Sequence, residues 1–338
     1  MLSRALNTKP RRMMRRVEEN QRSLSLSLSE YDDICIGCVD DTPLMTCPDD
    51  GDNELRWTMK DVMRASVGVL EESALGVAEK VVFLDGKCCV LKRFRMVCVG
   101  RKEFGRRVAR LALISRQCEY LVPVNAYLYS KRFKFVVYDY YPMGSLHDLL
   151  LGARKHGHTP LNWTQRFNII IQIARAIAFI HSQLPQHKDM VINVHGNLKP
   201  SNIMIGVDFS IRLSNYGFTQ LATEIPETLQ QKPLSPSSPL PLANIYKKSS
   251  SQRSDVYQFG LILMDMLGGP NALDSKQRVF ETKERGCDDK LGFFEFPFEG
   301  KESSKVFKVF DIALACIHRL PKVRPTIDNI LLYLEKNN

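Results

Sequence analysis

Three cysteines near the start of the chain have a spacing that suggests metal chemistry. Cys35 and Cys38 form a C-x-x-C pair, which is half of a zinc site, and Cys47 lies nearby. A structural zinc site needs four ligands, and no second pair or histidine follows at a usable spacing. We therefore predict no metal site here. The nine cysteines are odd in number, lie mostly among apolar residues and follow no cleavable secretory signal, which indicates reduced thiols in an intracellular protein.

A second group of polar residues has a more specific spacing. Residues 194–203 read Val-His-Gly-Asn-Leu-Lys-Pro-Ser-Asn-Ile, and thirteen residues beyond Asn202 stands Asn215-Tyr216-Gly217. These segments resemble the catalytic loop of eukaryotic protein kinases, H-R-D-x-K-x-x-N, and the D-F-G that follows it. The resemblance covers residues 57–335, and its other elements are the strand lysine in Val90-Leu91-Lys92, the buried helix in Ser254-Asp255-Val256-Tyr257-Gln258-Phe259-Gly260 and the late arginine in Arg324-Pro325.

Within that superfamily the chain is most similar to plant receptor-like kinases, in the leucine-rich-repeat branch with degenerate catalytic loops. The similarity is carried by Met63-Arg64-Ala65-Ser66, Leu121-Val122-Pro123, Val137-Tyr138-Asp139-Tyr140, Gly144-Ser145-Leu146 and His195-Gly196-Asn197-Leu198-Lys199. The chain departs from such receptors because it has no repeat ectodomain and no membrane span. Its longest apolar stretch, residues 167–180, is interrupted by polar residues and is too short to cross a bilayer. Receptor function is therefore not expected.

The resemblance implies that acids of the phosphoryl-transfer mechanism have been lost. Asn197 stands where an aspartate would accept the proton of the substrate hydroxyl, and an amide has no usable basicity. Asn215 stands where a carboxylate would bind magnesium, so metal binding should be weak. Arg107 stands where the helix acid would pair with Lys92, unless a shift in register lets Glu103 take that place.

The resemblance also implies which parts of a nucleotide site remain. Only Gly76 survives of the glycine-rich loop, and Glu71 and Glu72 would add negative charge near a polyphosphate. The predicted remnant of the nucleotide site consists of Gly76, Lys92, Tyr138 at the gate of the adenine pocket, Lys199, Asn202 as a metal ligand, and Asn215, with residues 139–141 as the hinge. The lysines either hold nucleotide loosely or have no ligand. Asp255 is expected to hold the catalytic-loop backbone, and Arg324 to lack its glutamate partner.

Patterns along the chain predict the elements that position these residues. Residues 77–84 and 87–94, joined by Asp85-Gly86, form a predicted hairpin, because Asp-Gly suits a tight turn. Thr58, with Asp61 three residues on, predicts a helix start. The remaining predicted strands are residues 121–128 and 133–140, and the predicted helices are 102–116, 167–181, 255–267 and 306–317. The expected fold is α+β, a bilobal kinase-like fold with a small β-rich N-lobe and a larger helical C-lobe.

The predicted domain organisation has three parts. Residues 1–55 form a flexible tail, residues 56–141 the N-lobe with its hinge, and residues 142–338 the C-lobe. Within the C-lobe, a Pro/Ser-rich activation-segment loop is expected near residues 226–254. Its Ser235-Pro236 and Ser238-Pro239 are either sites for a proline-directed kinase or part of a solvated linker.

Charge is unevenly distributed along the chain. The formal net charge is +10, but residues 1–29 hold seven Lys or Arg with two acids, and residues 30–54 hold nine acids and no base. Two tails of opposite sign argue against one nucleic-acid-binding face. The basic arm at residues 11–16 is either solvated, a targeting segment or a contact with an anionic membrane surface. We expect a cytoplasmic protein. If the basic arm binds anionic lipid, the alternative is a protein bound peripherally to the plasma membrane.

Together these observations predict a pseudokinase: an inactive kinase-like domain that acts as a signalling scaffold or allosteric partner, with at most weak nucleotide binding. No cofactor is required, and the ligand to test is ATP, with or without weakly bound Mg. The expected partners are signalling proteins, among them active receptor-like kinases. The alternative is a weakly active ATP-dependent Ser/Thr kinase that uses Lys92, Lys199 and Asn202.

Overall fold

The computed structural model describes residues 44–47, 57–97, 99–156, 160–184, 190–222, 251–269 and 293–336. These residues belong to two units. Leu44 and residues 57–65 lie in the smaller unit, in which Thr58 caps helix α2 (Met59–Arg64). The Thr58 hydroxyl accepts a hydrogen bond from the Asp61 amide, and the Asp61 carboxylate accepts one from the Thr58 amide, which confirms the predicted helix start.

The larger unit begins with an antiparallel sheet of six strands, in the order β1-β5-β6-β4-β3-β2. The strands are β1 (Met45–Thr46), β2 (Ser66–Ser73), β3 (Gly76–Val82), β4 (Cys88–Phe94), β5 (Val124–Tyr129) and β6 (Lys134–Asp139). Strands β3 and β4 form the predicted hairpin. Strand β1 lies inside the predicted tail and pairs with β5. Sequence periodicity did not predict it, because two residues are too few to show a period.

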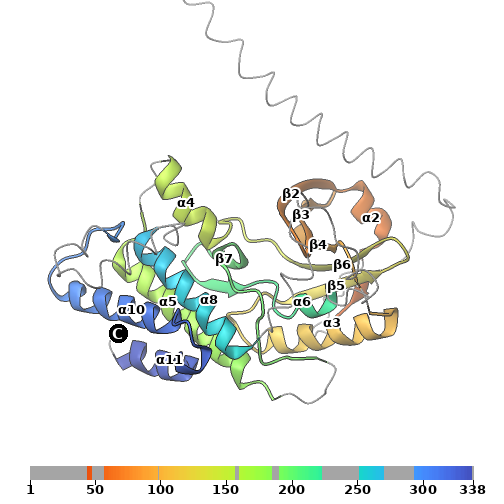
Figure 1. The fold of residues 1–338 in the computed structure, drawn as a ribbon. Coiled ribbons are helices and arrows are strands. Elements are labelled where there is room, and N and C mark those ends of the chain that lie inside the picture. Colours follow the sequence, from red (N-terminus) through yellow and green to blue (C-terminus); the bar gives the residue numbers. More distant parts are fainter. Residues whose placement is uncertain are drawn as a thin grey trace, which may run out of the picture. The chain divides into compact units, whose positions relative to one another are not determined.

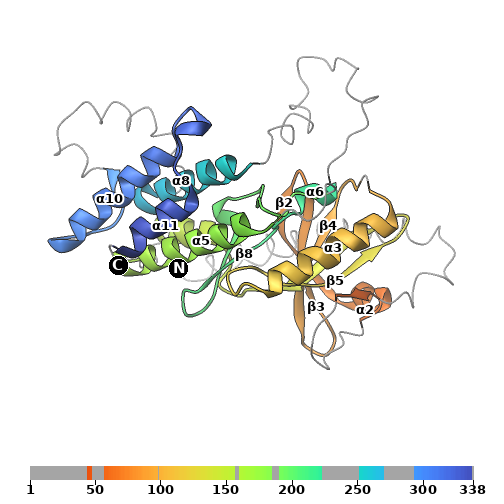
Figure 2. The ribbon, with the colours of Figure 1, turned by 90° about the horizontal axis from the view of Figure 1, so that it is seen from below.

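Helix α3 (Arg101–Arg116) packs against the sheet at β5, as Figure 2 shows. Its buried face includes Phe104, Val108 and Leu111. The Phe104 ring lies 5.9 Å from the Tyr127 ring and 5.3 Å from the Tyr129 ring, centroid to centroid. This sheet and helix form the β-rich N-lobe.

The C-lobe is mostly helical (Figure 1). Its longer helices are α4 (Leu146–His156), α5 (Trp163–Ser182), α8 (Gln252–Gly268), α10 (Lys301–Cys316) and α11 (Ile327–Lys336). Shorter elements are η1 (Pro200–Asn202), β7 (Ile203–Ile205), β8 (Ile211–Leu213), α6 (Thr219–Ala222) and η4 (Pro321–Val323). Helix α5 is mostly apolar, and α8 and α11 both pack against it.

Two differences from the predicted boundaries have local physical causes. The loop expected near residues 226–254 ends earlier, because Ser251 caps α8 by accepting a hydrogen bond from the Ser254 amide, and the helix begins at Gln252. Helix α5 begins at Trp163, because Asn162 and Gln165 form a capping box before it. The rest of that predicted loop, with its two Ser-Pro pairs, lies outside the described residues, as do Cys35, Cys38 and the basic arm.

Candidate functional site

Lys92 lies in the middle of the sheet, on β4, and its side chain is 0% exposed. Its ammonium donates a hydrogen bond to the Ser73 hydroxyl at 3.2 Å and lies 3.5 Å from a carboxylate oxygen of Glu71. Burial lowers the pKa of Lys92, while the charge of Glu71 opposes that shift. A buried charge is costly unless it is paired. Glu71 is therefore the counter-ion of Lys92.

The other carboxylate oxygen of Glu71 accepts a hydrogen bond from Lys199 Nζ at 2.5 Å. Burial by itself would raise the pKa of Glu71, but the hydrogen bond and charge of Lys199, together with Lys92, leave that pKa below its usual value. One carboxylate thus joins the two lysines that sequence analysis assigned to nucleotide phosphates. From the sequence we expected Glu71 to add negative charge near a polyphosphate, and we did not predict its contact with the two lysines.

The sheet register explains how Glu71 reaches Lys92. Glu71 pairs with Ala78 on β3, and Ala78 pairs with Lys92 on β4, so the three residues form one row across three strands. Side chains in such a row project from the same face of the sheet. The small Ala78 side chain between the two charged ones leaves them room to meet. The row of Glu71, Ala78 and Lys92 could have been predicted from strand pairing only with the correct register. That register depends on a bulge between Val69 and Glu71, for which the sequence has no recognisable pattern.

Arg107 on α3 does not approach Lys92. Its Nε lies 2.5 Å from Glu103 Oε1, and its Nη1 donates to the Gln220 carbonyl at 2.7 Å. Glu103 also accepts two hydrogen bonds from Arg106. The alternative in which Glu103 becomes the partner of Lys92 is therefore wrong, because both carboxylate oxygens of Glu103 are used by arginines of its own helix.

Three asparagines form a chain of amide contacts. Asn215 Nδ2 donates a hydrogen bond to Asn202 Oδ1 at 2.7 Å. Asn202 Nδ2 in turn donates one to the backbone carbonyl oxygen of Asn197 at 2.7 Å. Asn202 and Asn215 are both buried. Asn215 has a left-handed backbone, with φ 63°, which asparagine tolerates better than most residues. The two amides that sequence analysis placed at a metal site therefore bind each other.

This arrangement does not fit magnesium. Both side chains are neutral, Asn202 Oδ1 already accepts a hydrogen bond, and no carboxylate of a described residue takes part in this contact. Among the described residues, no group of three or more His, Cys, Asp or Glu side chains could hold a metal ion. Asn215 Oδ1 is buried and has no hydrogen-bond partner among the described residues, so one polar atom of the amide pair makes no hydrogen bond there.

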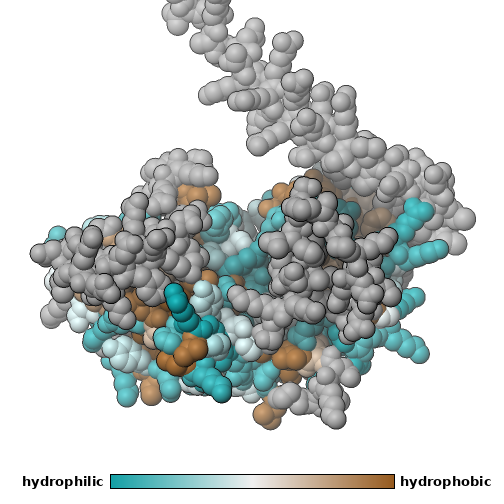
Figure 3. All heavy atoms as spheres, in the orientation of Figure 1, coloured by the Kyte–Doolittle hydropathy of each residue, from teal (hydrophilic) through white to brown (hydrophobic). Residues whose placement is uncertain are grey.

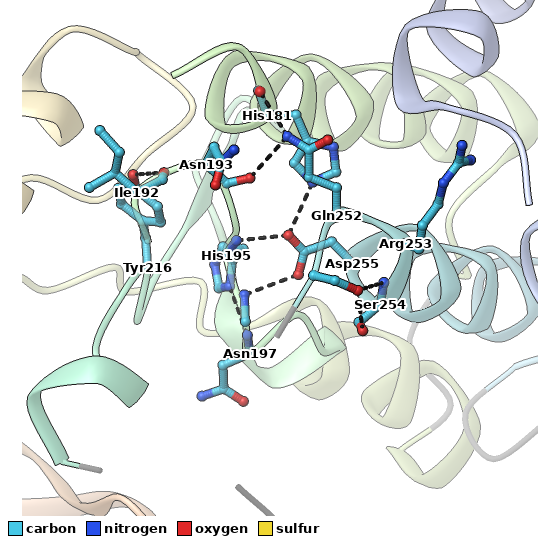
Figure 4. A network of polar contacts seen from close by, with 12 residues as sticks. His181, Ile192, Asn193, His195, Asn197, Tyr216, Gln252, Arg253, Ser254 and Asp255 are labelled. Carbon is cyan, nitrogen blue, oxygen red and sulfur yellow. Dashed lines mark hydrogen bonds and ion pairs between the residues drawn. The ribbon is translucent and has the colours of Figure 1, made fainter. Parts of the chain in front are cut away.

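Asp255, on α8, organises the backbone beside Asn197 (Figure 4). Its carboxylate accepts hydrogen bonds from the amides of His195 at 2.7 Å and Gly196 at 3.0 Å, and it lies 3.1 Å from His181 Nε2. This is the contact that the resemblance predicted. Gly196 has φ 77°, a conformation that disfavours side chains with a Cβ. Figure 4 shows the Asn197 side chain directed away from Asp255.

His195 predicts a pH dependence of stability. Burial lowers the pKa of its imidazole to about 4, although the charge of Asp255 opposes the shift. An unfolded histidine titrates near pH 6.5, so the unfolded chain binds more protons between those values, and stability falls as the pH falls. We expect His195 to account for a loss of about 3 kcal/mol across that window. Urea unfolding at about pH 7 and about pH 4.5 measures it, and a His195→Asn variant with the same pH dependence would contradict the assignment.

The remaining predicted residues lie around this centre or away from it. Gly76 closes the β2–β3 turn with φ 148°, and a Cβ there would come within 1.8 Å of the Arg93 carbonyl oxygen. Tyr138 is buried, with its ring 6.3 Å from that of Phe218, beside a cavity of about 10 Å³. Arg324 lies elsewhere in the C-lobe. Among the described residues its partners are the carbonyls of Arg253 and His318 and the ring of Tyr257, not a carboxylate.

Residues 99–334 match the family of protein tyrosine and serine/threonine kinases, and the chain belongs to that family. It is 34% identical over 297 residues to a probable inactive receptor kinase of Arabidopsis thaliana, covering 82% of this chain and 42% of that protein. It is 30% identical over 291 residues to an inactive leucine-rich repeat receptor-like serine/threonine-protein kinase of the same plant, with coverage of 82% and 42%. The resemblance to plant receptor-like kinases with degenerate loops is confirmed, and the chain spans less than half the length of these relatives.

Two solved structures share the fold. The pseudokinase domain of BIR2, an immune regulator of the RLK/Pelle family, has a TM-score of 0.70 at 22% identity, covering 89% of this chain and 91% of that one. The kinase domain of maize SIRK1 bound to AMP-PNP has a TM-score of 0.65 at 24% identity, with coverage of 85% and 98%. The expected bilobal α+β fold is thereby confirmed. No helix in the described part of the chain is long and apolar enough to cross a membrane.

Proposed function

We propose that this chain is a catalytically inactive kinase-like domain that acts in signalling by binding protein partners, with at most weak nucleotide binding. The observation that carries the proposal is the contact between the Asn215 and Asn202 amides, which uses the expected metal positions for a structural hydrogen bond. Asn197 also offers no base, a loss that alone costs about 10²–10⁴ in rate. Relatives named as inactive receptor kinases support the same conclusion.

The experiment has two arms, on the full chain. Thermal melting with ATP, with and without magnesium or manganese, should show no shift that depends on the metal, because a ligand that binds only the folded protein raises its melting temperature. Transfer of labelled phosphate from ATP to a generic substrate should equal that of an Asn197→Ala variant. Activity that Asn197→Ala abolishes would overturn the proposal.

A weakly active Ser/Thr kinase remains the second candidate. It is favoured by one observation: Lys92 and Lys199 lie close enough together to contact one anionic group, the Glu71 carboxylate, which a phosphate would have to displace. Metal-dependent binding of ATP, together with transfer that requires Asn197, would favour this candidate over the first.

The partners and the location of the chain are also proposals. We propose active receptor-like kinases as partners in the cytoplasm. Among the described residues that are visible in Figure 3, hydrophobic side chains are scattered among hydrophilic ones, so hydropathy alone singles out no docking surface in that part of the face. We also propose that the basic arm holds the chain peripherally at an anionic plasma membrane. Salt-sensitive binding to anionic vesicles, lost on deletion of residues 1–22, is the expected result.

A further inference from the structure

Glu71 connects the two lobes of the larger unit through a single side chain. It lies on β2 in the sheet, whereas Lys199 directly precedes η1 in the helical lobe, 128 positions later. The carboxylate is 26% exposed, the Lys199 side chain 36% and the Lys92 side chain 0%. Such partial burial strengthens an ion pair relative to one on the open surface.

The local backbone sets the position of this carboxylate. Glu71 follows the bulge in β2, and Ser73, two residues later, lies on the same face of the strand. The Ser73 hydroxyl donates to the Gly76 carbonyl at 3.0 Å and accepts from Lys92. The end of β2 therefore contacts Lys92 through two side chains on the same face, the Glu71 carboxylate and the Ser73 hydroxyl.

The neighbouring acid shows how an ordinary surface ion pair differs. Glu72 projects to the other side and pairs with Arg95, and the two side chains are 66% and 51% exposed. Exposed pairs of this kind contribute little. Glu71 instead contacts two lysines at once, and one of them has no access to solvent.

We propose that Glu71 is a built-in anion that occupies the place of a nucleotide phosphate between Lys92 and Lys199, ties the sheet to the loop before η1 without nucleotide, and excludes phosphate from both lysines. The ligand class that competes with it is a polyphosphate. We call the contact of Glu71 with Lys92 and Lys199 the ion-pair latch. The latch does not depend on whether the chain acts as a scaffold, and it requires no metal.

The test is ATP binding to the full chain in EDTA, compared between wild type, Glu71→Gln and Glu72→Gln. Glu71→Gln is nearly isosteric and frees two cations, so it should bind ATP at least about ten-fold more tightly than wild type. Glu72→Gln removes the same charge one residue away and should stay within about two-fold of wild type. Equal affinity in all three proteins would overturn the proposal.

A second measurement reports on the connection between the lobes. Without ATP, amides of residues 66–76 should exchange hydrogen faster in Glu71→Gln than in Glu72→Gln, and ATP should slow them again. If Glu71→Gln fails to fold, Glu71→Asp keeps the charge but is one methylene too short to reach both lysines, and it should also bind ATP more tightly. Unchanged exchange and affinity in that variant would refute the latch. Because phosphate transfer is assayed separately, failure of the latch leaves the proposed inactivity intact.

Discussion

Replacing Asp255 with alanine should lower the free energy of unfolding by about 3–5 kcal/mol, the largest effect that we expect from any single substitution in the described C-lobe. Asp255 is 1% exposed, and its carboxylate accepts hydrogen bonds from the amides of His195 and Gly196. Alanine leaves both amides without an acceptor, and a buried donor without a partner costs its full desolvation energy. His181 loses its carboxylate partner as well.

Chemical unfolding of the full chain measures this loss. Asp311→Ala is the matched control, because Asp311 is exposed on α10, and such surface substitutions usually stay within about 0.5 kcal/mol. Asp255→Asn should give an intermediate loss, since its amide retains one oxygen acceptor. If Asp255→Ala were as stable as Asp311→Ala, the loop before η1 would not depend on this carboxylate.

The second large effect concerns the amide pair. Asn215→Asp, which restores the acid of an active kinase, should destabilise the metal-free protein by about 2–4 kcal/mol. The new carboxylate would replace a donor that lies 2.7 Å from Asn202 Oδ1, in a position only 5% exposed. Two oxygens would then face each other without a proton between them.

The pH dependence and a metal titration make this prediction specific. Burial raises the pKa of a carboxyl group, so the folded variant binds more protons than the unfolded one, and its stability deficit should grow as the pH rises above about 4. Added magnesium should recover part of the loss, because a carboxylate is a ligand it favours. Asn329→Asp, on an exposed part of α11, should show neither effect. An Asn215→Asp variant that equals wild type without metal would show that the amide pair is dispensable.

The motif positions were readable from the sequence because each depends on residue identity at a short, fixed spacing. Asn197, Asn202 and Asn215 could be placed at base and metal positions without coordinates. What those asparagines do could not be read in the same way. Their mutual hydrogen bonds depend on the left-handed backbone at Asn215 and on the approach of η1 to that residue. Neither feature has a local sequence signal.

The sequence by itself determined the hairpin and the main helices, since these follow from periodicity and turn chemistry. Its resemblance to receptor-like kinases indicated the fold class and the positions at which asparagines stand in place of catalytic acids. Only the tertiary structure decided which charges meet. Glu71 becomes the counter-ion of Lys92 and Lys199 because a bulge sets its register opposite Ala78, and because the loop before η1 reaches the sheet. Contacts between residues 128 positions apart depend on packing of the whole unit, which no short pattern encodes.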